Sequence, residues 1–168
     1  PKPHAAVTLT RFADHRILVR SIDGQGAGFT LKGQGSRNLF DAFNFDGDIH
    51  ITNVDAVHHG AKGDLIGRWT AGKGKNGTPW KFNFDGRGTD FATGYAEFDR
   101  LLGPTPKLDG EATLMDDKWS FSKLTAIGHK ANVGGSGTMD EAQNLKFTLD
   151  WGAKGPFQML PKTAERFG

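Results

Sequence analysis

The chain has 168 residues, which favours a single domain large enough to fold around its own core. Its 24 glycines are about twice the usual share, and 13 Phe and 4 Trp accompany one Tyr, a content of large apolar side chains that excludes a disordered chain. The 21 basic and 19 acidic residues are interspersed and leave a formal charge of +2, so the sequence lacks the electrostatic footprint of a protein that binds nucleic acid or an anionic membrane.

No segment of the sequence reaches the roughly 18–20 apolar residues of a membrane-spanning helix, and the first residues lack the apolar core of a signal peptide. The absence of Cys excludes disulfides and thiolate metal sites. Because the sequence starts at Pro1 rather than at Met, we expect a mature form or a fragment. Residues 1–168 are expected to be one β-rich domain, a segment of a longer repeat protein.

Apolar residues recur at every second position in short runs, which is the pattern of strands with one buried face. The runs are Val7–Leu9, Ile17–Val19, Phe29–Leu31, Phe43–Phe45, Ile49–Ile51, Trp80–Phe84, Ala112–Leu114, Trp119–Phe121 and Leu145–Trp151. Turns are predicted at pairs that end in Gly, because Gly tolerates positive φ. These pairs are Asp23-Gly24, Asp46-Gly47, Asn76-Gly77, Asp85-Gly86, Asp109-Gly110 and Gly134-Gly135. The sequence therefore predicts many short antiparallel strands.

Two stretches depart from this pattern. Residues 36–42 predict one helical turn capped by Ser36. Residues 94–102 predict a short helix, since Tyr95, Phe98 and Leu102 recur at helical spacing before Gly103-Pro104 ends the pattern.

The five-residue segment Phe-Asn-Phe-Asp-Gly occurs twice, as Phe43–Gly47 and as Phe82–Gly86. The unequal spacing of these and the other Asp-Gly pairs does not support the fixed period of a propeller or solenoid. A degenerate strand repeat remains, as in an elongated sheet with connections of variable length.

The sequence contains partial matches to phosphate-binding and metal-binding motifs, but the residues around each match do not fit the motif. Residues 67–74 match a phosphate loop except that Gly74 stands where Ser or Thr should bind the metal. Residues 86–91 resemble one unit of a calcium-binding β-roll without the tandem copies that such a roll needs. His58 and His59 are adjacent and cannot share one strand face, so a zinc site with His50 is not supported. We expect no catalytic residues, no metal and no cofactor.

Residues 47–51, 91–103 and 128–137, within the period-two strand pattern, resemble the AsmA-like repeat proteins, nearest to TamB-type translocation and assembly modules. The resemblance lies in the general pattern of residues rather than in one motif, and it extends over about the whole chain. It implies an all-β fold with an elongated antiparallel sheet, curled into a taco-like trough, and one or two short helices. It also implies a periplasmic location, in a parent protein anchored in the inner membrane of a Gram-negative bacterium.

The same resemblance implies a non-enzymatic role in phospholipid transport, outer-membrane protein assembly or both. The expected partners are phospholipid acyl chains and an outer-membrane barrel protein of the TamA type. Phe lacks a polar atom and suits a dry lining better than Tyr does. The residues expected to line the apolar groove are Phe43, Phe45, Ile49, Ile51, Trp80, Phe82, Phe84, Leu145, Phe147 and Leu149.

Composition does not distinguish an open trough from the sealed core of a β-sandwich. A carbohydrate-binding β-sandwich is therefore the alternative, in which exposed Trp69, Trp80, Trp119 or Trp151 stacks on sugar rings. A β-sandwich glycosidase or other hydrolase ranks behind it.

Overall fold

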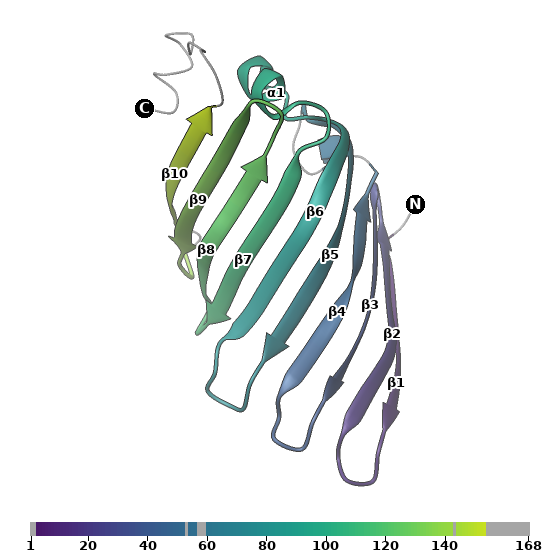
Figure 1. The fold of residues 1–168 in the computed structure, drawn as a ribbon. Helices are drawn as coiled ribbons and strands as arrows, with labels where there is room; N and C mark the ends of the chain where they lie inside the picture. Colours follow the sequence, from purple (N-terminus) through teal and green to yellow (C-terminus); the bar gives the residue numbers. More distant parts are fainter. Residues whose placement is uncertain (1–2, 53, 57–59, 143, 154–168) are drawn as a thin grey trace.

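The computed structural model describes residues 3–52, 54–56, 60–142 and 144–153, which form one open antiparallel sheet with a short helix at one end (Figure 1). Ten strands follow one another in chain order across the sheet, each paired with its neighbours in sequence. The all-β prediction is confirmed. No second sheet layer is present among these residues, so the β-sandwich alternative is wrong.

The strands are β1 (His4–Arg11), β2 (Ile17–Gly26), β3 (Phe29–Arg37), β4 (Phe43–Ile51), β5 (Lys62–Lys73), β6 (Trp80–Ala92), β7 (Lys107–Met115), β8 (Lys118–Ile127), β9 (Ala131–Met139) and β10 (Leu145–Ala153). A single 3-10 turn, η1 (Val54–Ala56), lies between β4 and β5, and the helix α1 (Ala96–Leu102) lies between β6 and β7. The hairpin turns after β1, β3, β5, β7 and β9 lie at one end of the sheet, and α1 lies at the other (Figure 1).

Most of the pairs predicted as turns lie inside strands instead. Asp23-Gly24, Asp46-Gly47, Asp85-Gly86, Asp109-Gly110 and Gly134-Gly135 belong to β2, β4, β6, β7 and β9, and none of their glycines has a positive φ. Successive strand residues point to opposite faces, so each Asp lies on the face opposite to its Gly. Asn76-Gly77 does form a turn, with φ +83 at Gly77.

The helix predicted at residues 94–102 is confirmed, as α1. The helical turn predicted at residues 36–42 is wrong, because β3 continues to Arg37. Asn38 Oδ1 accepts hydrogen bonds from the backbone N–H groups of Phe40 and Ala42, at 2.8 and 3.1 Å. These bonds close a tight turn in which Asp41 has φ +58.

Enclosed apolar packing is confined mainly to the end of the sheet that carries α1. Leu101 and Leu102 are buried there, and their carbonyls accept hydrogen bonds from the backbone of Lys130 and His129, just before β9. Ala131, the first residue of β9, is fully buried. Among the described residues, nothing comparable covers the middle of the sheet, so its apolar side chains stay open to solvent on one side.

Candidate functional site

The strand register places all ten residues of the expected groove on one face of the sheet. Residues directly opposite each other in an antiparallel pair share a face. Starting from Phe45, the pairs Phe45–Ala71, Ala71–Phe82 and Phe82–Ala112 carry the same face from β4 to β7. Further pairs extend it to Phe147 on β10. We call this the apolar face; it holds Phe43, Phe45, Ile49, Ile51, Trp80, Phe82, Phe84, Leu145, Phe147 and Leu149.

Aromatic rings form a connected row across the apolar face. Neighbouring ring centroids are 5.1–6.4 Å apart, a range in which aromatic side chains attract one another. The row consists of Phe43, Phe45, Trp80, Phe82, Trp119, Phe121 and Phe147. It runs from β4 to β10.

Along one line through the middle of this face, large and small side chains alternate from strand to strand. This cross-strand line reads Val19, Gly35, Phe45, Ala71, Phe82, Ala112, Phe121, Gly137 and Phe147. Because neighbouring strands are only about 4.8 Å apart, rings on alternate strands need small residues between them. A ring also lies over a glycine in a neighbouring line of the same face: a Cβ on Gly33 would be 2.6 Å from Cζ2 of Trp69. The excess of Gly and the excess of Phe in the composition are therefore one structural feature.

The apolar face is uncovered and reaches both edges of the sheet. Its central side chains are half-buried by one another, whereas at the edges Val7 on β1 is 57% exposed and Leu145 on β10 is 60% exposed. Contiguous exposed apolar surface of this extent marks an interaction site in a folded protein.

Three of the four tryptophans proposed as sugar platforms belong to the interior of this face. Trp69, Trp80 and Trp119 are half-buried, while Trp151 on the edge strand β10 is 52% exposed. Trp151 is therefore the most exposed of the four, and the other three are partly covered by their neighbours.

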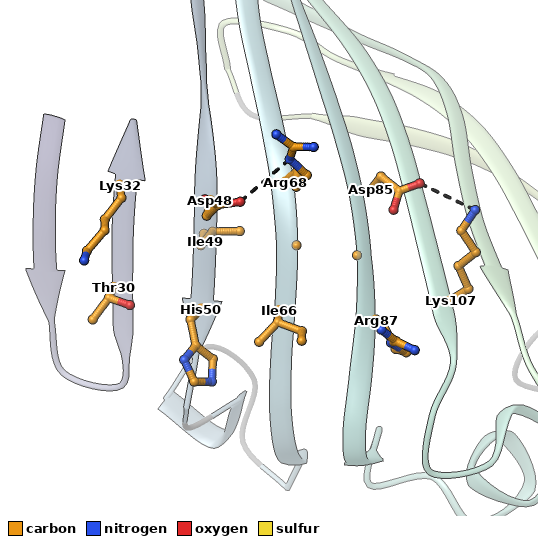
Figure 2. Close-up of a pocket in the computed structure, with 12 residues that line it drawn as sticks. Thr30, Lys32, Asp48, Ile49, His50, Ile66, Arg68, Asp85, Arg87 and Lys107 are labelled. Carbon is orange, nitrogen blue, oxygen red and sulfur yellow. Dashed lines mark ion pairs between the residues drawn. The ribbon is translucent and has the colours of Figure 1, made fainter. Parts of the chain in front are cut away.

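The opposite face carries a line of charges that alternate in sign over four strands. The cross-strand line Lys32, Asp48, Arg68 and Asp85 runs from β3 to β6 (Figure 2). Arg68 Nε is 3.8 Å from Asp48, and Lys107 Nζ is 3.5 Å from Asp85. Opposite charges on neighbouring strands attract each other, so this line favours the observed register.

A hollow of about 710 Å³ lies on this charged face, and Figure 2 shows the side chains that line it. Of the ten groove residues, Ile49 alone contributes to its lining. Lys32 and Arg87, also in the lining, form no ion pair among the described residues. This hollow was not predicted from the sequence. The signal was present, because Lys32, Asp48 and Arg87 alternate with apolar or Gly residues in their strands and so lie on the face opposite to the apolar one.

The residues singled out for metal or phosphate chemistry are not brought together. Among the residues that the structure describes, no three His, Asp or Glu side chains are placed to hold a metal ion. His58 and His59 lie outside the described residues, and His50 is 3.5 Å from Asp64 on the charged face. The phosphate-loop match at residues 67–74 lies mostly in β5, whose residues are extended.

No helix within the described ranges is long and apolar enough to cross a membrane. In comparisons with known proteins, no family model matches the chain, and no curated protein or solved structure matches it either.

Proposed function

We propose that the apolar face binds the acyl chains of phospholipids and that the chain is a non-enzymatic segment of a periplasmic bridge between the two membranes of a Gram-negative bacterium. The observation that carries the proposal is the apolar face itself, which extends from β1 to β10 and over which the described residues form no second layer. The resemblance to AsmA-like proteins supports the location and the class of ligand.

The chemistry of the face suits a lipid that slides. Each buried CH₂ contributes about 0.8 kcal/mol without preferred direction, so an acyl chain gains affinity while staying free to move along the surface. The aromatic row supplies apolar contacts at every second strand, from Phe45 through Phe82 and Phe121 to Phe147. In the middle of the sheet the charged groups lie on the other face, whereas Arg37 and Lys73 lie opposite Phe43 at the end of the row nearest the hairpin turns.

The strand edges support the proposed partners. β1 and β10 each pair with a strand on one side only among the described residues. An unpaired edge can accept a further strand by β-augmentation. We propose that a neighbouring repeat, or a strand of an outer-membrane barrel of the TamA type, continues the sheet there and that the parent protein is anchored in the inner membrane.

Two adjacent residues of β10 provide a matched test. Phe147 lies on the apolar face, and the exposed Thr148 beside it lies on the charged face. We expect Phe147→Asp to abolish most photo-crosslinking of a phospholipid carrying a reactive acyl chain, whereas Thr148→Asp leaves crosslinking unchanged. Far-UV spectra and unfolding midpoints check that both variants fold. Equal crosslinking in the two folded variants would contradict acyl-chain binding on this face.

One further variant distinguishes sugar binding from lipid binding. Because Trp151 is 52% exposed, it is the tryptophan best placed to stack on a sugar ring. Retention of the chain on a polysaccharide resin that is lost in Trp151→Ala would favour carbohydrate binding over lipid binding. We expect no such retention.

A further inference from the structure

The hairpin turns at the end of the sheet opposite to α1 separate into two chemically different groups (Figure 1). We call residues 11–16, 37–42 and 73–79, at the ends of the first three hairpins, the basic rim. Its cations outnumber its carboxylates by five to two: Arg11, Arg16, Arg37, Lys73 and Lys75 against Asp14 and Asp41. The turns after β7 and β9 have the opposite balance, with Asp116, Asp117, Asp140 and Glu141 against Lys118.

Both carboxylates of the basic rim are already paired locally. Asp14 is 2.7 Å from Arg16, and Asp41 pairs with Arg37. Asp41 also accepts a hydrogen bond from Asn76, at 3.3 Å, which links the second hairpin turn to the third. Arg11, Lys73 and Lys75 form no ion pair with any described residue, so positive charge is left over at this rim.

Large apolar side chains project from the same turns. Phe40 is 77% exposed, the highest value among the exposed large apolar residues described, and Leu39 beside it is 58% exposed. Phe12, in the neighbouring hairpin turn, is 40% exposed, with the Arg16 guanidinium 5.2 Å from its ring centroid. Leu39 and Phe40 occupy the apex of their turn, whereas Arg37 and Lys73 end their strands. The apolar groups therefore lie farther out along the strand direction than these cations.

We propose that the basic rim docks on an anionic lipid surface, with Phe12, Leu39 and Phe40 inserted among the acyl chains and the cations at the level of the phosphates. Apolar side chains that project beyond a layer of cations match the order of layers at a membrane surface. The rim adjoins the apolar face, because Arg37 and Lys73 lie opposite Phe43, but its turns contact the bilayer end-on.

A second copy of the chain fits the rim less well. The acidic turns of a second copy complement the rim in charge, but their exposed apolar residues, Met115 and Leu145, lie within strands rather than at a turn apex. They offer no apolar surface into which Leu39 and Phe40 could insert. The basic rim cannot be recognised in the linear sequence, where charges of both signs are interspersed, because Arg11, Arg37 and Lys73 come together only when the strands pair.

The test is flotation of the full chain with vesicles of phosphatidylcholine alone or mixed with phosphatidylglycerol. We expect binding to the mixed vesicles that weakens as salt is raised. Leu39→Ser with Phe40→Ser is expected to lower that binding at least about tenfold. Replacing Lys73 and Lys75 by Gln is expected to lower it about fivefold for each cation removed.

One control keeps the result specific. Met115→Ser with Lys118→Gln, at an acidic turn, is expected to float like the unaltered chain. Equal binding to both vesicle types would overturn the proposal, as would an equal loss in the acidic-turn control. If the chain associates with itself without vesicles and Leu39→Ser with Phe40→Ser abolishes that association, a second copy is the occupant and the proposal is wrong.

Discussion

The two faces of this sheet are both built on alternation across the strands, but they alternate in different properties. The apolar face alternates in size, as in the line from Gly35 through Phe45 and Ala71 to Phe82. The charged face alternates in sign, as in the pairing of Asp48 with Arg68. When a side chain of the apolar face is removed, nothing replaces its packing contacts. When an exposed ion pair is broken, water solvates the charge that is left. The apolar face should therefore determine stability, and the charged face should adjust it slightly.

The largest effect is expected from a ring in the middle of the aromatic row. Phe82 lies between Trp80 and Trp119, with ring centroids 6.2 and 5.1 Å away. Phe82→Ala removes these contacts and should lower the free energy of unfolding by about 2–4 kcal/mol, toward the lower part of the range for core Phe because the ring is only half-buried. Urea denaturation measures the change.

The adjacent residue on the charged face is the matched control for Phe82. Asn83 is exposed and donates a hydrogen bond to Thr70 Oγ1, at 3.0 Å. Asn83→Ala should cost less than about 1 kcal/mol. Losses of equal size in Phe82→Ala and Asn83→Ala would show that the two faces contribute alike.

Two neighbouring glycines of β9 test the size alternation by addition rather than removal. A Cβ on Gly135 would lie 2.6 Å from Cε1 of Phe147, so Gly135→Ala should destabilise the fold by about 1–3 kcal/mol through overpacking. A Cβ on Gly134, on the opposite face, meets nothing closer than 3.8 Å. Gly134→Ala should therefore stabilise by about 0.4–1 kcal/mol, because Ala restricts the unfolded chain. Thermal unfolding of both variants measures the difference in sign, and shifts of the same sign would contradict the alternation.

The sequence was sufficient to predict the faces but not the packing between strands. Period two assigns Phe43 and Phe45 to the same side without any knowledge of their neighbours. The size alternation depends on which residues lie opposite one another, and a single strand carries no record of that register. For the same reason the pair Asp46-Gly47 resembled a turn, because Thr70 and Trp69, the residues opposite Asp46 and Gly47 on β5, come from another part of the chain.

A smaller effect is expected from the charged line. Arg68 has a side chain 82% exposed and stands 3.8 Å from Asp48, a geometry in which water screens most of the attraction. Arg68→Gln should change the free energy of unfolding by no more than about 0.5 kcal/mol. The difference should shrink further when the urea titration is repeated at high salt. If Arg68→Gln lowered the free energy of unfolding as much as Phe82→Ala, the charged face would contribute as much to stability as the apolar face, contrary to this prediction.

The smallest effect is expected at Lys107, where the charged face is measurable by titration rather than by stability. Asp109 and Asp85, whose carboxylates lie 3.6 and 3.5 Å from Lys107 Nζ, raise the pKa of this lysine above its ordinary value, and the charge of Asp109 is the largest single cause. Since the folded-state pKa is the higher one, any stabilisation is present below the unfolded pKa of about 10.4 and is lost as pH rises through the folded pKa. NMR titration of the Lys107 side chain should show Asp109→Asn lowering its pKa more than Asp85→Asn, in keeping with the less exposed carboxylate of Asp109, 19% against 67%. If the two variants leave the Lys107 pKa unchanged, the ion pairs of this face are not formed in solution, and the apolar face alone holds the register.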